Sequence, residues 1–210
     1  MNLPNQLTIL RILLTPLFVV FLFSQNLILK YIALLIFLIA TLTDWYDGYI
    51  ARKYGVVTIW GKFLDPLADK ILVSSTLFAL YFLHKVELWM TYIIVIRDFL
   101  ITGLRSYAMF RKQPVITSQL AKIKTFTQMT VVYFILFLYL IEITYDEHSI
   151  LIQFLHFLES IRFVYWLMLF ITALTVFTAI QYFVVNGHHL KNMIVDLVNL
   201  MKSTRRRNCD

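Results

Sequence analysis

Six long apolar stretches dominate this sequence and constrain its fold more than any other feature. Each has roughly the 20 mostly apolar residues that a helix needs to cross a bilayer. They cover residues 8–24, 28–46, 64–83, 89–110, 120–141 and 162–185. None alternates with the two-residue period of a barrel strand. The pattern therefore predicts an all-α, polytopic membrane protein with six transmembrane helices.

The composition favours a bilayer as the solvent of this chain. Of its 210 residues, 60% are hydrophobic and only 15% are charged. A soluble fold of this size could not bury so much apolar surface, which excludes compact nucleic-acid-binding modules and disordered chains. The single cysteine, Cys209, cannot form an internal disulfide. No small-residue cleavage site follows the first apolar stretch, so we expect it to remain as a span.

The distribution of basic residues predicts the orientation in the membrane. All but three of the 19 Lys and Arg fall at one set of connections and span ends, and the exceptions are Lys30, Lys85 and Arg162. The positive-inside rule then places both termini and the 48–63 connection in the cytoplasm. The net charge of +7 also favours anionic partners, phosphates and anionic lipids first.

The chain reads as one membrane domain, residues 1–187, followed by a basic tail, residues 188–210. Several apolar residues of the tail are spaced as one face of a helix: Met193, Ile194, Leu197, Leu200 and Met201. This spacing predicts a C-terminal helix that lies on the membrane surface. The alternative is a basic tail with no role beyond topology.

Four of the twelve acidic residues gather between residues 43 and 70: Asp44, Asp47, Asp65 and Asp69. At 100° per residue, Asp44 and Asp47 share a helix face, and so do Asp65 and Asp69. A short connection would fold the two helices antiparallel and bring the four carboxylates together. Pro66 leaves a second possibility open, in which Asp65 is the N-cap of a helix that begins there.

Four converging carboxylates near a bilayer need protons or a divalent cation among them. Oxygen-only ligands favour Mg²⁺ or Mn²⁺. Gly48 and Ala51 leave the helix surface open beside these carboxylates, and Arg52 offers donors suited to phosphate. Together these residue types indicate a metal-dependent pyrophosphate site at the cytoplasmic membrane face.

The same residues carry a family resemblance. The pattern Asp44-x-x-Asp47-Gly48-x-x-Ala51-Arg52, eight residues, Gly61-x-x-x-Asp65-x-x-x-Asp69 resembles the complete signature of the CDP-alcohol phosphatidyltransferases. The resemblance implies Asp44, Asp47, Asp65 and Asp69 as ligands of Mg²⁺ or Mn²⁺, with Asp69 also the catalytic general base. The residues implied to hold the CDP moiety are Asn5, Thr8, Gly48, Ala51, Arg52, Thr58 and Gly61.

Beyond the signature, the chain resembles the bacterial phosphatidylglycerophosphate synthase branch of that family. The resemblance rests on the opening Asn2–Arg11, on residues 96–105 and on residues 122–129, with Asp98 where that branch usually has Glu. It implies transfer of a phosphatidyl group from CDP-diacylglycerol to glycerol 3-phosphate, in a multi-pass protein of the bacterial inner membrane. A homodimer is compatible with this reading.

Basic residues at the cytoplasmic ends of the fourth and fifth spans are candidates for binding an acceptor phosphate: Arg97, Arg105, Lys122 and Lys124. Basic residues also end spans on this side for topological reasons alone. Other acceptors within the family remain open, namely serine, inositol phosphate and phosphatidylglycerol. Two other classes also remain, a cation transporter that uses the clustered aspartates and an inactive scaffold that binds a nucleotide lipid.

Overall fold

The computed structural model describes the backbone of residues 3–54, 59–110, 119–146 and 148–207, and the side chains of residues 8–43, 67–109, 119–146 and 148–187. The described residues form helices and no strands, as the sequence predicts. The helices are α1 (Leu3–Leu22), α2 (Leu27–Tyr54), α3 (Ile59–Phe82), α4 (Leu88–Phe110), α5 (Gln119–Thr144), α6 (Ile150–Ser160) and α7 (Phe163–Arg207).

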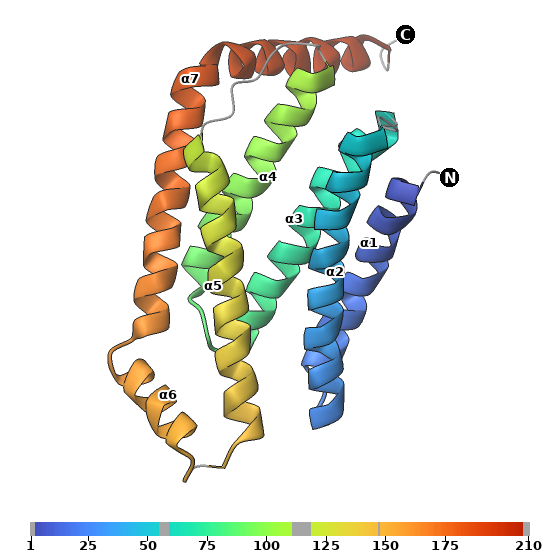
Figure 1. The fold of residues 1–210 in the computed structure, drawn as a ribbon. Helices are drawn as coiled ribbons and strands as arrows, with labels where there is room; N and C mark the ends of the chain where they lie inside the picture. Colours follow the sequence, from blue (N-terminus) through green and yellow to red (C-terminus); the bar gives the residue numbers. More distant parts are fainter. Residues whose placement is uncertain (1–2, 55–58, 111–118, 147, 208–210) are drawn as a thin grey trace.

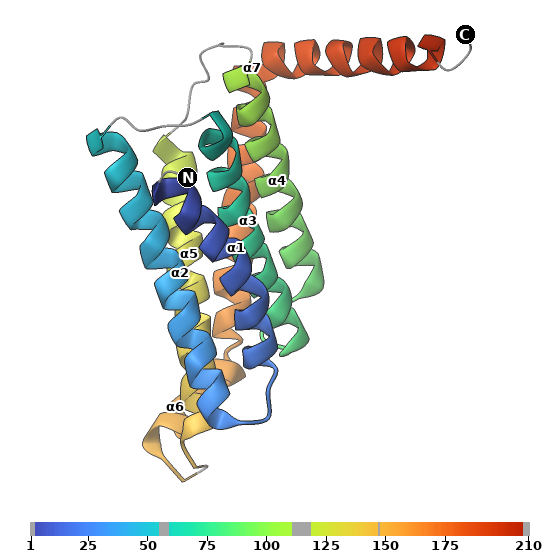
Figure 2. The ribbon, with the colours of Figure 1, turned by 90° about the vertical axis from the view of Figure 1, so that its right-hand side faces the viewer.

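Long helices run side by side along most of the molecule (Figures 1 and 2). α1 packs against α2 and α3, α4 packs between α3 and α7, and α5 packs against α7. Aromatic rings join three of the helices in the core, with centroids 5.3 Å apart for Phe18 and Phe37 and 5.0 Å for Phe37 and Tyr133. In an apolar solvent such close packing, rather than the hydrophobic effect, holds helices together.

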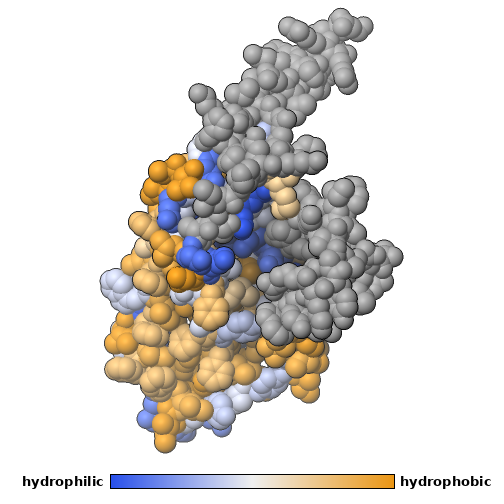
Figure 3. All heavy atoms as spheres, turned by 45° about the horizontal axis from the view of Figure 1, so that its top comes forward, coloured by the Kyte–Doolittle hydropathy of each residue, from blue (hydrophilic) through white to orange (hydrophobic). Residues whose placement is uncertain are grey.

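The outer surface of the bundle is apolar. Figure 3 shows hydrophobic side chains over most of the described flank, with hydrophilic ones gathered toward the end where α7 bends. Large apolar side chains such as Leu13, Phe126 and Val184 are 65%, 76% and 78% exposed. A soluble monomer rarely exposes so much contiguous apolar area, so this surface fits a membrane protein.

Two described helical segments are long and apolar enough to cross a membrane, Gln119–Thr144 and Phe163–Gly187. The apolar segments Thr8–Leu22, Leu27–Thr43 and Ile150–Ser160 are shorter. α4 has the length of a span, but Arg97, Asp98 and Arg105 interrupt its apolar sequence. Intramembrane charges of this kind usually mark a functional site.

The helix ends that carry the predicted site lie at one end of the bundle. The N-terminus, the end of α2, the start of α3, the end of α4 and the bend in α7 all lie at this end (Figures 1 and 2). α6 and the α3–α4 connection lie at the opposite end. We call these the signature end and the far end.

α7 bends at Asn186, whose backbone is not helical (φ −112°, ψ 21°). The Asn186 side chain is buried, and its Nδ2 donates a hydrogen bond to the Tyr182 carbonyl at 3.3 Å. Beyond the bend the helix continues to Arg207, turns steeply away from the bundle axis and projects sideways from the signature end (Figure 2). The backbone is therefore helical where the sequence predicts a C-terminal helix.

α6 is a helix that the sequence pattern does not predict, since residues 142–161 fall between two predicted spans. Ser149 is its N-cap, and the Ser149 Oγ accepts a hydrogen bond from the backbone N–H of Leu151 at 3.3 Å. Ile152, Leu155 and Leu158 are buried against α5 and α7. Tertiary packing thus stabilises a helix too short to be a span.

Candidate active site

The four signature aspartates belong to two helix ends that lie at the same end of the bundle (Figure 1). Asp44 and Asp47 are in the last three turns of α2, while Asp65 and Asp69 are in the first three turns of α3. Because α3 begins at Ile59, Asp65 is inside the helix and is not its N-cap. The side chains of Asp44, Asp47 and Asp65 lie outside the described residues.

The implied CDP-binding residues fall mostly outside the described side chains: Asn5, Gly48, Ala51, Arg52, Thr58 and Gly61. Thr8 is described, and it is buried near the start of α1. It lies three residues before Arg11 and therefore on nearly the same face of α1.

Asp69 is the signature aspartate whose side chain the structure describes. The Arg11 Nη1 donates a hydrogen bond to the Asp69 Oδ1 at 3.0 Å, and this ion pair joins α1 to α3. The Arg11 side chain is 1% exposed, whereas that of Asp69 is 40% exposed. A buried guanidinium requires an anionic partner. Arg11 therefore fixes the Asp69 carboxylate while leaving it accessible from solvent.

A second charged group lies deeper in the bundle, and we call Lys70, Arg97, Asp98 and Lys124 the Asp98 cluster. The Asp98 Oδ1 accepts hydrogen bonds from the Lys124 Nζ at 2.5 Å and the Arg97 Nη1 at 3.1 Å. The Lys70 Nζ lies 3.7 Å from the Asp98 Oδ2. The side chains of Asp98 and Lys124 are 4% and 0% exposed. One carboxylate thus joins α3, α4 and α5.

The Asp98 cluster carries more positive than negative charge. Three cations share a single carboxylate in a buried environment, where unbalanced charge is costly. The Arg97 Nη2 also donates a hydrogen bond to the Thr178 Oγ1 of α7 at 2.9 Å, which fixes the guanidinium. The buried Arg97 Nε and Gln128 Oε1 have no hydrogen-bond partner among the described residues. This arrangement is suited to an anionic ligand that also offers hydrogen-bonding groups.

The structure separates the four predicted acceptor-binding cations. It brings Arg97 and Lys124 together at Asp98. Lys122 lies two residues earlier in α5 and is exposed, because a shift of two residues turns a side chain about 200° around a helix. Arg105 is exposed two turns after Arg97 in α4. Although Asp98 is shorter than the glutamate usual in the resembled branch, it still reaches Arg97.

The sequence analysis did not identify the roles of three residues in the Arg11–Asp69 pair and around the Asp98 cluster. These residues are Arg11, Lys70 and Thr178. Arg11 could have been found, because a charged residue inside an apolar stretch usually has a partner or a function. Lys70 was counted only as a topological cation, and no sequence pattern marks Thr178 as a partner of Arg97.

A comparison with known protein families identifies the family of this chain. The sequence profile described as "CDP-alcohol phosphatidyltransferase" matches residues 1–177, most of the chain. The chain belongs to the CDP-alcohol phosphatidyltransferase family. The resemblance drawn from the aspartate pattern is thereby confirmed.

Relatives in this family are similar over more than half of the chain. The CDP-diacylglycerol–glycerol-3-phosphate 3-phosphatidyltransferase of Rickettsia felis is 42% identical over 128 residues, which are 61% of this chain and 71% of that protein. The enzyme of the same name from Bacillus subtilis is 40% identical over 143 residues, 62% of this chain and 74% of that protein. A probable phosphatidylglycerophosphate synthase of Mycobacterium tuberculosis is 39% identical over 130 residues, 60% of this chain and 62% of that protein.

Divalent-metal dependence is general in the CDP-alcohol phosphatidyltransferase family. Among the described residues no group of three or more His, Cys, Asp or Glu is close enough to hold a metal ion, and three of the four signature aspartates lie outside them. The described member, Asp69, presents a solvent-accessible carboxylate at the signature end. Oxygen donors of this kind fit a hard cation such as Mg²⁺ or Mn²⁺.

Proposed function

We propose that this chain transfers the phosphatidyl group of CDP-diacylglycerol to sn-glycerol 3-phosphate, which gives phosphatidylglycerophosphate and CMP. Membership of the CDP-alcohol phosphatidyltransferase family supports the reaction class, and the names of the relatives from R. felis and B. subtilis support both substrates. The chain is thus a phospholipid-synthesising transferase.

The Asp98 cluster is the observation that carries the choice of acceptor. Within the described cluster the positive charges exceed the negative by two, and this excess matches the phosphate dianion of glycerol 3-phosphate. Arg97 and Lys124 are the central binding residues in this proposal, with Lys70 beside them, and the exposed Arg105 and Lys122 would contact the acceptor phosphate as it arrives. Serine, an acceptor with no net charge, would leave the positive charge of the Asp98 cluster unbalanced.

The reaction is a direct displacement at the lipid-side phosphorus of CDP-diacylglycerol. The acceptor hydroxyl oxygen forms a bond to this phosphorus, its proton passes to the Asp69 carboxylate, and the bond to the bridging oxygen of CMP breaks. Arg11 holds Asp69 in place during this step. Most of the acceleration comes from positioning and from matching the charge of two bound phosphates.

A divalent cation, Mg²⁺ or Mn²⁺, would be held by Asp44, Asp47, Asp65 and Asp69, and it would neutralise the pyrophosphate charge. Asn5, Thr8, Gly48, Ala51, Arg52, Thr58 and Gly61 would hold the CDP moiety. These assignments rest on the family signature and on the position of both helix ends at the signature end.

The proposed membrane arrangement has six spans, formed by α1 to α5 and by α7 up to its bend. Residues 1–187 form the membrane domain, and residues 188–210 form the basic tail on the cytoplasmic surface. Both termini and the active site face the cytoplasm of a bacterial inner membrane, which the distribution of Lys and Arg supports. The exposed apolar flank would also accommodate a second copy of the chain.

The test is release of CMP from CDP-diacylglycerol by the purified chain in detergent micelles. Release should require both Mg²⁺ or Mn²⁺ and an acceptor, and glycerol 3-phosphate should exceed serine, inositol phosphate and phosphatidylglycerol. Preference for another acceptor would contradict the argument from the Asp98 cluster. A stable phosphatidyl-enzyme formed without acceptor would contradict direct transfer.

A further inference from the structure

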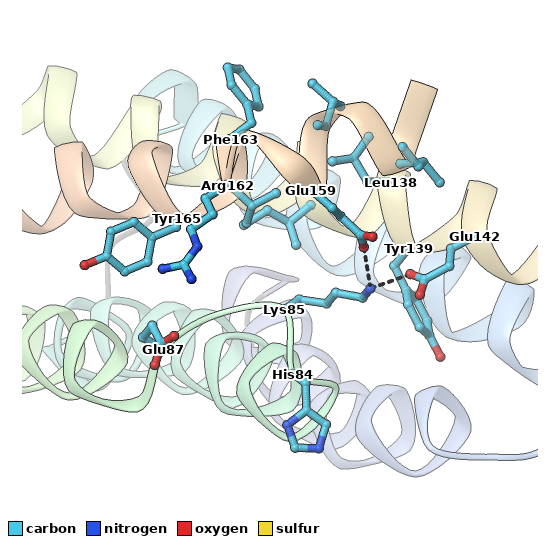
Figure 4. A pocket seen from close by; sticks show the side chains of 14 residues that line it. His84, Lys85, Glu87, Leu138, Tyr139, Glu142, Glu159, Arg162, Phe163 and Tyr165 are labelled. Carbon is cyan, nitrogen blue, oxygen red and sulfur yellow. Dashed lines mark ion pairs between the residues drawn. The ribbon is translucent and has the colours of Figure 1, made fainter. Parts of the chain in front are cut away.

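A cavity of about 330 Å³ lies at the far end, away from the signature. It is enclosed by the α3–α4 connection, the end of α5, the end of α6 and the start of α7 (Figure 4). Charged side chains line it beside an apolar wall that includes Leu138, Leu155 and Phe163. The reaction proposed above uses none of these residues.

The charges around this cavity are only partly matched within the protein. The Lys85 Nζ lies 2.6 Å from the Glu142 Oε2 and 3.7 Å from the Glu159 Oε1 (Figure 4). Arg162 and Glu87 also line the cavity, and neither side chain has an ion pair among the described residues. Figure 4 shows the Arg162 guanidinium extending from the α6–α7 junction toward the α3–α4 connection, where Glu87 lies. Because Lys85 is shared by two glutamates, the lining has two cations and three anions, and the exposed Arg162 and Glu87 are the groups outside the Lys85 ion pairs.

The backbone at two cavity residues is strained. Within the described chain, the non-glycine residues with positive φ are His84 (57°) and Arg162 (50°), and both line this cavity. Each ends a helix in the left-handed conformation that glycine adopts most easily. Both of these costly backbone conformations fall at the same cavity, which makes it a candidate site.

α6 places this cavity at the level of the lipid head groups, because its three faces meet three environments. One face packs on the bundle through Ile152, Leu155 and Leu158. A second face is apolar and exposed: Ile150, Phe154, Phe157 and Ile161. The third is polar and exposed: Gln153, His156, Glu159 and Ser160. A helix with one face in protein, one suited to lipid and one suited to water lies along the membrane surface.

We propose that the cavity binds the head group of a zwitterionic phospholipid that carries a phosphate and a primary ammonium group. The phosphate oxygens accept hydrogen bonds from the Arg162 guanidinium, and the ammonium donates to the Glu87 carboxylate. The apolar wall contacts the glycerol backbone of the lipid. This site is separate from the active site and does not depend on the proposed transferase reaction.

The full-length protein in nanodiscs tests this inference. The nanodiscs hold equal amounts of phosphatidylethanolamine and phosphatidylglycerol, and native mass spectrometry measures the lipids that stay bound to the released protein. Loss of one charge-assisted hydrogen bond changes affinity about tenfold. We expect phosphatidylethanolamine to be enriched about tenfold on the unaltered chain, and Glu87→Gln and Arg162→Gly to abolish this enrichment.

Arg162→Gly also distinguishes binding from folding, because glycine relieves the backbone strain at this position. Its thermal stability should equal or exceed that of the unaltered chain while the lipid enrichment is lost. Asp146→Asn is the matched control for Glu87→Gln, since it removes a charge at the far end outside the cavity lining. It should keep the enrichment.

Three outcomes would overturn the proposal. One is equal retention of both lipids by the unaltered chain, and another is loss of enrichment in the Asp146→Asn control. The third outcome would show that the cavity binds a soluble ligand and not a lipid. If soluble phosphoethanolamine stabilises the chain in nanodiscs of phosphatidylglycerol as much as phosphatidylethanolamine does, the site belongs to a soluble zwitterion.

Discussion

Replacing Lys124 by methionine would test the charge of the Asp98 cluster directly. Methionine has a similar length and keeps helix propensity, but it carries no charge. Asp98 would still have Arg97 and Lys70 as partners, so the chain should fold. The acceptor phosphate would face two cations of the cluster instead of three.

The burial of Lys124 sets the expected magnitude. Its side chain is 0% exposed and its Nζ lies 2.5 Å from the Asp98 Oδ1, so solvent does not screen its charge. A hydrogen bond to a charged group contributes about 1.5–3 kcal/mol. We therefore expect the apparent KM for glycerol 3-phosphate to rise roughly 10- to 150-fold. The KM for CDP-diacylglycerol should change less than about threefold, a difference well below 1 kcal/mol.

The assay is CMP release in detergent micelles, with each substrate varied while the other is saturating. Lys122→Met is the matched control, because it removes the same charge from an exposed position on the same helix. Its effect should be within the range of an exposed charge, about 1 kcal/mol or less. Equal increases for both lysine variants, or equal increases in both KM values, would refute the role of the buried cluster.

Three further predictions concern the signature end. Asp69→Asn should lower kcat about 10²- to 10⁴-fold at saturating metal and CDP-diacylglycerol, the contribution of a general base; an unchanged kcat would exclude this role. Thr178→Val removes the 2.9 Å hydrogen bond to the Arg97 Nη2, and kcat/KM for glycerol 3-phosphate should fall about fivefold. An unchanged value would show that this bond does not position Arg97. Chelation by EDTA should stop CMP release, and Mg²⁺ or Mn²⁺ in excess should restore it; activity that persists after exhaustive chelation would exclude the metal.

The sequence predicts the long helices because length and hydropathy are local properties. The predicted span 89–110 and α4 (Leu88–Phe110) differ by one residue at the start. α2 continues to Tyr54, eight residues beyond the predicted end at 46. Hydropathy detects the apolar part of a helix, and the polar last turns of α2 fall outside that signal.

The sequence did not predict α6, because its 11 residues are too few for a span and its polar face interrupts the apolar run. Its stability depends on contacts of Leu155 and Leu158 with side chains of the neighbouring helices α5 and α7, such as Leu138 and Phe163. A local pattern carries little information about such contacts.

The candidate site also has features that the sequence predicts and features that only the packing of the helices shows. The signature identified the family through residue types at fixed spacing, which a sequence displays directly. Charge counting could not distinguish buried Lys124 from exposed Lys122, because both are basic residues at one span end. The helical phase holds part of the answer, since Lys124, Gln128 and Val131 all lie on the buried face of α5. That Asp98 binds Lys124 follows only from the packing of α4 and α5 around it.

The bend at Asn186 has a geometric consequence for the substrates. At 1.5 Å per residue, the 45 residues of α7 would form a straight rod about 68 Å long, more than twice the ~30 Å thickness of a hydrocarbon core. With the bend, the second part of the rod projects sideways from the bundle, and on the membrane surface proposed for it, it would oppose vertical displacement of the protein in the leaflet. The height at which a lipid-borne donor meets a water-borne acceptor is then set by the position of one asparagine.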